Sequence, residues 1–345
     1  MVSRRVYGKY RTEQLPKEKP SKSRKAVLWF VALIIIVCVI VIGINQSNKS
    51  EHTPKTQPPQ PPAIRQPARQ EPVKPKDAAL PKIESQPKLE AVIPTTRTQP
   101  QVGEVMINTI NMKLVYIPAG EFMMGSPPGE AERVSCEDPQ HRVRIGNPFW
   151  MGATEVTQAQ WQAVMGNNPS YFKGEKLPVE NVSWDDATAF CKKLSEKEKK
   201  HYRLPTEAQW EYACRAGTAT PFNTGETIST DQANYDGHNI YGSGRIGIAR
   251  QKTTEVGSFP ANGFGLHDMH GNVWEWCSDW YDDKYYSKSP DADPENMVSG
   301  EYRVLRGGSW DVEPGRCRSA HRHGFTPDYR FFNCFGFRVV VLDLQ

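Results

Sequence analysis

The sequence predicts an α+β domain with little regular secondary structure, preceded by one transmembrane helix and a disordered linker. Three observations support this expectation. Residues 26–44 form one uncharged, apolar run, and residues 45–102 are rich in proline. Residues 103–345 alternate short, capped helical patterns with glycine-rich stretches, which is typical of short strands and long ordered loops.

The apolar run 26–44 has the length of a membrane-spanning helix. At a rise of about 1.5 Å per residue, it nearly matches a hydrocarbon core about 30 Å thick. A cleaved signal peptide is the alternative, but it usually has a shorter apolar run and an Ala-x-Ala cleavage pattern. Residues 1–25 carry nine Lys/Arg and two Glu, so we expect a cytoplasmic N-terminal tail. The prediction is a single-pass protein of the bacterial inner membrane, with its C-terminal domain periplasmic or extracellular.

The linker, residues 45–102, lacks the residues that build a core. Its first 56 residues, 45–100, contain twelve prolines and no Phe, Tyr, Trp or Gly. Such a segment cannot bury enough apolar surface to offset its ordering entropy. In extended polyproline II form, at about 3.1 Å per residue, it reaches up to about 170 Å. We expect a passive spacer, with a cell-wall-spanning arm or a partner ligand as the alternative.

The net charge of +4 hides an uneven distribution. Residues 1–25 carry +7, residues 45–100 carry +4 and residues 26–44 carry none, which leaves −7 on residues 101–345. A surface that binds duplex nucleic acid needs a basic face that neutralises phosphates. The acidic domain therefore argues against nucleic acid as a partner.

Elements within residues 103–345 follow from turn and capping signals. Two apolar runs flank Pro118-Ala-Gly120 and predict a β-hairpin over residues 112–125. Three helices are predicted where a Ser or Thr precedes an apolar 3.6-residue period. Their expected N-caps are Thr157, Ser183 and Thr206, and Gly166 and Gly217 are expected to end the first and third.

The segment from Asn262 to Tyr281 has the densest chemistry. Trp274, Trp276 and Trp280 lie within seven residues, with Asp268, Glu275 and Asp279 among or before them. Tryptophans anchor cores, and a buried carboxylate needs donors or a cation beside it. The pattern indicates a core segment wrapped around a polar or ionic centre; a surface turn with exposed acids is the alternative.

This segment resembles the signature of the formylglycine-generating enzyme, or sulfatase-modifying-factor, family. Six further blocks match in the family's order over residues 103–345: Gly120–Ser126, Glu155–Thr157, Pro178–Trp184, Arg203–Tyr212, Arg303–Trp310 and Gly336–Arg338. The resemblance implies an irregular α+β domain related to C-type lectin folds. Long loops in a compact domain usually need cross-links such as metals or disulfides.

The resemblance implies structural calcium in the signature segment. Its ligands would be the side chains of Asp268 and Glu275 and the carbonyls of Gly271 and Val273. Mixed carboxylate and carbonyl oxygens are what hard cations prefer. The alternative is that both acids only cap backbone amides. A second family site would use Asn234 and the Tyr235 carbonyl, although the other half of that site has no clear match here.

Histidines offer a rival metal hypothesis. Two His-rich motifs, His-x-x-His and His-x-His, could converge on a transition metal. The alternative is that the first pair flanks the calcium loop and the second lies on the surface. The residues concerned are His267, His270, His321 and His323.

Six cysteines lie outside the apolar run, and an even number in an exported domain suggests disulfides. The family resemblance implies a Cys214–Cys317 bond, and Cys191 with Cys334 is the next candidate; Cys136 and Cys277 have no assigned partner. Active family members hold copper with two cysteines between Gly-Gly-Ser and the next arginine-rich strand. The matching interval here, residues 310–316, contains no cysteine. Copper is therefore not expected.

Three functions follow as hypotheses, because fold alone does not decide between them. The first is a membrane-anchored, calcium-stabilised binding or accessory module of the cell envelope, whose protein or peptide partner the sequence does not name. The second is an oxidoreductase or hydrolase with His-based metal chemistry. The third is formylglycine generation on sulfatases, which would need Cys317 and a mobile neighbour such as Cys136 or Cys334.

Overall fold

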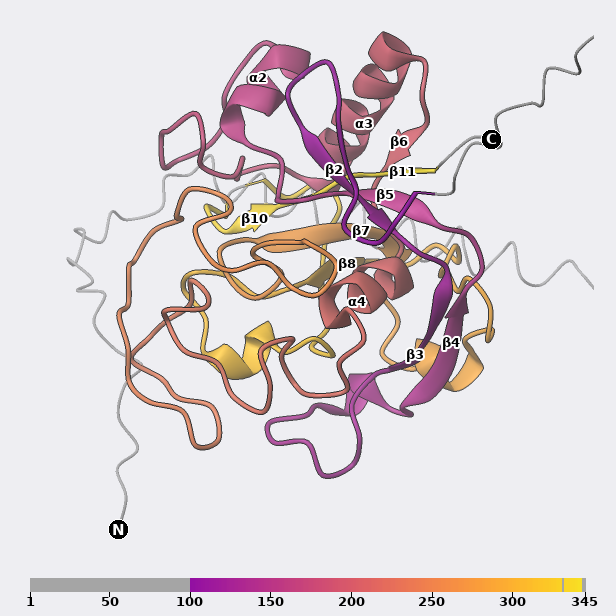
Figure 1. Ribbon diagram of the computed structural model, residues 1–345, viewed down its shortest axis with the longest axis vertical. Helices are drawn as coiled ribbons and strands as arrows, with labels where there is room; N and C mark the ends of the chain where they lie inside the picture. Colours follow the sequence, from indigo (N-terminus) through magenta and orange to yellow (C-terminus); the bar gives the residue numbers. More distant parts are fainter. Residues whose placement is uncertain (1–99, 331, 343–345) are drawn as a thin grey trace, which may run out of the picture. The chain divides into compact units, whose positions relative to one another are not determined.

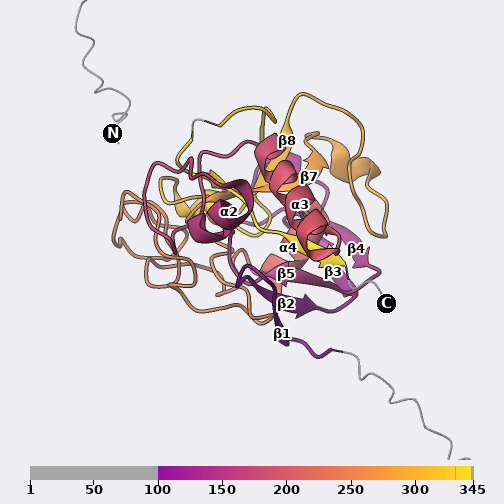
Figure 2. The same ribbon diagram turned by 90° about the horizontal axis from the view of Figure 1, so that it is seen from above.

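The structure is a computed structural model that describes residues 100–330 and 332–342. The basic tail, the predicted transmembrane helix 26–44 and nearly all of the linker lie outside these residues. Within them, no helix is both long and apolar enough to cross a bilayer. Figures 1 and 2 show short strands and three short helices joined by long loops, as the sequence predicts.

A five-stranded sheet brings the two ends of the described domain together. Its order is β1-β2-β5-β11-β6, and every pairing is antiparallel. The last described strand, β11, lies between β5 and β6, so it completes a sheet that the first described strand, β1, begins. The bounds are β1 Val105–Ile107, β2 Lys113–Ile117, β5 Phe149–Gly152, β6 Tyr202–Arg203 and β11 Val340–Leu342.

The predicted hairpin over residues 112–125 is wrong. Its two arms, β2 and β3 (Gly120–Met124), belong to different sheets, because β3 pairs with β4 (His141–Ile145) instead. Pro118 and Ala119 form the corner between the sheets. A turn signal between two apolar runs marks a change of direction but does not specify which strand each run will join.

The signature segment forms the centre of the third sheet. β7, Trp274–Trp280, pairs antiparallel with β8, Arg303–Arg306, and parallel with β10, Phe335–Gly336; β9, His323–Phe325, completes the order β10-β7-β8-β9. Four of the first five residues of β7 are fully buried. The interpretation of residues 262–281 as a core segment is therefore confirmed, and the surface-turn alternative is excluded.

Capping boxes start each of the three α-helices in the described part of the chain. α2 (Gln158–Met165), α3 (Trp184–Glu198) and α4 (Glu207–Arg215) each have a Ser or Thr N-cap that accepts from the N3 amide, and an N3 side chain that bonds back. Gly166 ends α2 in the left-handed conformation as predicted. α4 is capped one residue before Gly217, at Ala216, with φ 44°. Short 3₁₀ turns occupy Ser135–Glu137, Tyr285–Lys288 and Pro314–Cys317.

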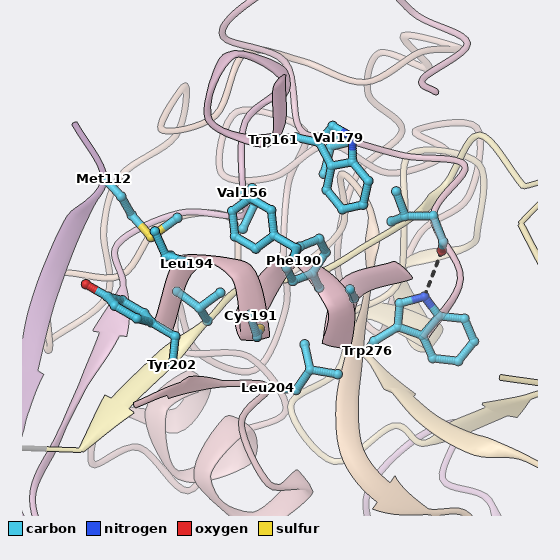
Figure 3. Close-up of a cluster of buried hydrophobic side chains, with 14 of the residues drawn as sticks. Met112, Val156, Trp161, Val179, Phe190, Cys191, Leu194, Tyr202, Leu204 and Trp276 are labelled. Carbon is cyan, nitrogen blue, oxygen red and sulfur yellow. Dashed lines mark hydrogen bonds between the residues drawn. The ribbon is translucent and has the colours of Figure 1, made fainter. Parts of the chain in front are cut away.

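The larger core cluster forms around α3. Phe190, Cys191 and Leu194 of this helix belong to one buried cluster with Trp161 of α2 and Trp276 of β7 (Figure 3). Phe190 stacks on Trp161 at 5.6 Å between ring centroids, and each fully buried large side chain contributes roughly 1.5–3 kcal/mol. The Trp276 indole donates to the Val182 carbonyl at 3.0 Å, which fixes β7 against the start of α3.

Buried arginine–glutamate pairs cross-link the loops where metals or disulfides were expected. Four fully or almost fully buried glutamates each accept from an arginine that lies at least 63 residues further along the chain. The pairs are Glu137–Arg318, Glu207–Arg322, Glu211–Arg306 and Glu275–Arg338.

Candidate metal centre

The signature segment makes a tight loop before β7. Asp268, Gly271 and Asn272 have φ values of 58°, 85° and 63°, so three of five residues adopt the left-handed conformation. A Cβ on Gly271 would lie 2.2 Å from the carbonyl oxygen of Asn234, which explains the glycine there. This loop is where the sequence predicts calcium.

Glu275 forms a buried ion pair with Arg338. Arg338 donates to both of its carboxylate oxygens at 2.6 Å, and the Trp210 indole donates to one of them at 2.8 Å. A guanidinium in this position supplies the positive charge that a cation would otherwise supply. The predicted calcium ligands Asp268, Gly271, Val273 and Glu275 therefore stay a prediction, and in this structure Arg338 is the partner of Glu275.

Only one of the two carboxylate oxygens of Asp268 has a hydrogen-bond partner among the described residues. Its Oδ2 accepts from the Gly257 amide at 2.6 Å, whereas its Oδ1 is buried and has no hydrogen-bond partner. Glu155 shows the same asymmetry: Oε1 accepts from the Asn272 side chain at 2.9 Å, and Oε2 is buried without a partner. Glu155 begins a family block and follows β5 by three residues, and the sequence reasoning did not identify it as a site residue.

Glu155 and Asp268 form no ion pair among the described residues, so the negative charge of each is not compensated by a direct cationic partner. Burial and the charge of Asp268 raise the pKa of Glu155 well above its ordinary value. Burial likewise raises the pKa of Asp268. Arg338 attracts both carboxylates but forms its ion pair with Glu275. Three acids therefore share one buried guanidinium.

The two predicted calcium sites form one network. The Asn234 side-chain amide donates to Asn272 Oδ1 at 3.2 Å, and Asn272 in turn donates to Glu155. Asn234 Oδ1 is buried without a partner. Tyr235 is buried and donates its hydroxyl to the Ile228 carbonyl at 3.1 Å. Asn272, which the sequence reasoning missed, thus links the first site to the second.

The four histidines of the transition-metal hypothesis have other partners in the described part of the chain, and the hypothesis stays a prediction. His270 uses both ring nitrogens: Nδ1 donates to the Cys317 carbonyl at 2.7 Å, and Nε2 accepts from the Asn223 amide at 3.0 Å. His267 Nδ1 lies 2.7 Å from the Phe259 carbonyl. His321 and His323 pack on Trp274 instead. Among the described residues, no three His, Cys, Asp or Glu side chains are grouped closely enough to hold a metal ion.

The predicted disulfides are wrong in this structure. All six cysteines in the described part of the chain are free, buried thiols. Cys214 contacts the Ser319 hydroxyl at 3.6 Å and the His270 ring at about 4 Å, and it belongs to a different apolar cluster from Cys317. Cys191 and Cys334 share a cluster but are not bonded. The even number of cysteines in a domain that was expected to be exported therefore suggested disulfide bonds that this structure does not contain among its described residues.

Comparison with known proteins decides the family. The sulfatase-modifying factor enzyme 1-like domain matches residues 101–342. The chain belongs to the formylglycine-generating enzyme family. A formylglycine-generating enzyme of Streptomyces coelicolor is 32% identical over 287 residues, which cover 65% of this chain and 87% of the relative. The mouse enzyme is 35% identical over 211 residues, or 58% and 53% of the two chains.

Two solved structures similar to this chain support the fold. PvdO from Pseudomonas aeruginosa is 31% identical with a TM-score of 0.61, and the match covers 71% of this chain and all of PvdO. The Treponema denticola variable protein 1 is 30% identical with a TM-score of 0.59, covering 70% of this chain and all of that one. The predicted fold class is confirmed for the domain.

Residues 310–316 match the interval that holds the copper-binding cysteines in active family members, but they contain no cysteine in this chain. Ser309 donates to Asp311 at 2.6 Å, and the Trp310 indole donates to the Asn333 carbonyl at 3.1 Å. Phe172 meets the Trp310 ring edge to face at 5.6 Å. Cys317, at the end of the following 3₁₀ turn, is fully buried, and burial raises its thiol pKa.

Proposed function

We propose that this chain is a binding or accessory module of the cell envelope that does not generate formylglycine. The observation that carries the proposal is the interval 310–316, which contains no cysteine and leads into a buried Cys317. Relatives that use copper hold it with two cysteines in the matching interval. This member retains the residues that build the domain and lacks that pair.

The chemistry of the remaining thiols supports the proposal. Copper(I) favours soft sulfur ligands, and the ligand is the thiolate. Burial raises the pKa of Cys214 to about 12 and that of Cys317 above its ordinary value. Both sulfurs are therefore protonated at neutral pH, and neither faces a substrate thiol from a solvent-accessible position.

Relatives with other roles also support the proposal. The chaperone protein LppX of Paenibacillus barcinonensis is 31% identical over 252 residues, covering 59% of this chain and 80% of the relative. The name of this relative describes a chaperone. We propose the same general mode for this chain, with an envelope protein or peptide as partner.

We further propose that the chain is anchored in the inner membrane by residues 26–44, with the linker 45–102 spacing the domain outside. The proposal rests on the apolar run and the charge of +7 before it. Protease added to intact spheroplasts should remove the C-terminal domain and leave a short N-terminal fragment. Full protection of the domain would refute the orientation.

The test of the catalytic part uses the purified full chain with copper(I), oxygen and a sulfatase-type peptide bearing Cys-x-Pro-x-Arg. Mass spectrometry follows conversion of the peptide cysteine to the aldehyde, with the Streptomyces coelicolor enzyme as positive control. We expect no turnover by this chain. Turnover that disappears in Cys317→Ser would overturn the proposal.

A further inference from the structure

We propose that the cavity between residues 281–283 and residues 296–300 holds a lysine or arginine side chain of a peptide partner, which also places an apolar side chain against Met297 and Val298. The inference rests on the proposed function, because it names the chemical class of partner that the binding module takes. Its residues belong neither to the cysteine-free interval 310–316 nor to the loop before β7.

The connection from β7 to β8 encloses this cavity, whose volume is about 440 Å³. One wall continues directly from the end of β7, and the other precedes β8. Pockets that hold small ligands have volumes of about 300–1,000 Å³, so the cavity has room for a long side chain. The residues that line it include Tyr281, Asp282, Asp283, Asn296, Val298 and Gly300.

Asn296 joins the two walls. Its side-chain amide donates to the Trp280 carbonyl at 2.8 Å, and its Oδ1 accepts from the Val298 amide at 3.2 Å. Main-chain bonds add to this link, since the Trp280 amide donates to the Asn296 carbonyl at 2.9 Å and the Tyr281 amide donates to the Tyr302 carbonyl at 2.7 Å. The walls are therefore fixed before a ligand binds, which lowers the entropic cost of binding.

The same connection concentrates the negative charge of the domain. Residues 281–302 contain six acids and two lysines, so they carry −4 of the −7 on residues 101–345. Asp282 is already paired, because its Oδ2 accepts from Lys288 Nζ at 2.6 Å and its Oδ1 accepts from the Lys284 amide at 2.9 Å. The exposed Asp283 carboxylate has no hydrogen bond or ion pair among the described residues. A cationic group is thus the ligand that this wall attracts, and an anionic group is repelled.

The rim of the cavity is apolar. Val298 is 78% exposed and Met297 is 72% exposed, which makes them the most exposed large apolar side chains of residues 100–330 and 332–342. Single exposed apolar side chains are common on protein surfaces. Two adjacent ones on a loop that Asn296 holds in place, beside a cavity, are typical of a surface that a partner covers.

Lysine and arginine match both parts of this surface. Each carries a cationic head on an aliphatic stem, so the stem packs on apolar side chains while the head meets a carboxylate. A metal ion would use Asp283 but would leave Met297 and Val298 uncovered. Nucleic acid would meet the charge of −4 with phosphates of the same sign. A basic peptide with apolar neighbours is therefore the class of partner that fits.

The experiment measures fluorescence anisotropy of a rhodamine-labelled peptide, Ala-Val-Lys-Val-Ala-Lys-Val, titrated with the full chain in non-ionic detergent. Two control peptides carry glutamate or norleucine in place of both lysines. We expect the lysine peptide to bind at least about tenfold more tightly than either control, because only its side chain has both the stem and the charge. Added salt should weaken this binding, since the carboxylate is exposed to solvent.

Two variants test the two parts of the surface. Asp283→Asn should weaken binding of the lysine peptide by about fivefold, the upper range for one solvent-exposed ion pair. Val298→Ser should weaken it by about tenfold through the loss of buried apolar area. Both side chains are exposed, so neither change should alter the melting temperature.

Each variant has a matched control elsewhere on the domain. Glu196→Gln removes one negative charge from an exposed glutamate of α3, and Ile246→Ser removes an apolar side chain that is 63% exposed. Neither residue lines the cavity, so both variants should bind the lysine peptide as wild type does.

Three results would overturn the proposal. The first is equal binding of the lysine and glutamate peptides, or no binding of either. The second is equal weakening by Asp283→Asn and Glu196→Gln, which would assign the effect to net charge alone. The third is self-association of the chain that Val298→Ser abolishes, which would make a second copy the occupant. The peptide oxidation assay uses a different substrate and readout, so the failure of this site is distinguishable from the failure of the proposed function.

Discussion

Two sets of buried carboxylates in this domain differ in what faces them. Glu137, Glu207, Glu211 and Glu275 each accept from an arginine. Glu155, Glu180, Asp268 and Asp279 are equally buried but form no ion pair among the described residues. The first set joins distant loops into one framework, whereas the second leaves charge or hydrogen-bonding capacity uncompensated.

The difference appears in the direction of the pKa shifts. Burial alone would raise the pKa of Glu137, but His321 nearby and the hydrogen bonds and charge of Arg318 hold it well below its ordinary value. Burial raises the pKa of Glu180 and of Asp279 to about 7, because no cation opposes it strongly. Pairing therefore separates acids that stabilise the fold from acids that are poised to take a proton or a cation.

Breaking a framework pair should have the largest effect. Arg318→Met leaves Glu137 buried without its bidentate partner, which donates at 2.7 and 2.9 Å. Removing one member of a buried pair costs about 3–5 kcal/mol. We expect a loss of this size in the free energy of unfolding, measured by urea denaturation at pH 7.

The double variant Arg318→Met, Glu137→Leu is the control for this prediction. It removes one of the two buried carboxylates that Arg318 faces, the other being Glu130, so it should be more stable than Arg318→Met alone. If the single variant costs less than about 1 kcal/mol, the arginine pairs are not the framework that we describe.

Replacing an unpaired buried acid should have the opposite effect on the free energy of unfolding, and that effect should depend on pH. Asp279 caps the start of α4 by accepting from the Glu207 amide at 2.7 Å, and also accepts from the Asn296 amide at 2.8 Å. Its pKa is about 7 in the folded state and near 4 when unfolded. The folded state therefore binds the extra proton between pH 4 and 7, and this group's contribution to stability falls as pH rises through that window.

The measurement compares wild type with Asp279→Asn by urea denaturation from pH 5 to 8. The free energy of unfolding of the variant should rise relative to that of wild type by roughly 2–4 kcal/mol as pH rises, because Asn cannot ionise. Taking the difference removes the opposite slope of His270, whose pKa burial lowers to about 4. A gap that does not change with pH would place the Asp279 pKa near its ordinary value.

An exposed pair should show the smallest effect. Arg245 and Asp231 are 2.8 Å apart, and their side chains are 76% and 68% exposed. Solvent screens such a pair, so Arg245→Met should change the free energy of unfolding by no more than about 0.5 kcal/mol. A loss near that of Arg318→Met would show that burial is not what separates the two sets.

Local signals in the sequence predicted local structure well. Thr157, Ser183 and Thr206 were identified as N-caps because a capping box involves residues only three apart. The signature segment was identified as core from its three tryptophans. The hairpin at Pro118 failed because strand pairing depends on β4, more than twenty residues away.

The sequence by itself determined the family, the acidic character of the domain, the caps of its helices and the cysteine-free interval at residues 310–316. Only the tertiary structure decided how the charged groups are partnered. Glu275 and Arg338 are 63 residues apart, and Glu155 and Asn272 are 117 apart. No periodicity spans such distances, because hydrogen bonds form between groups that the fold brings within 3 Å.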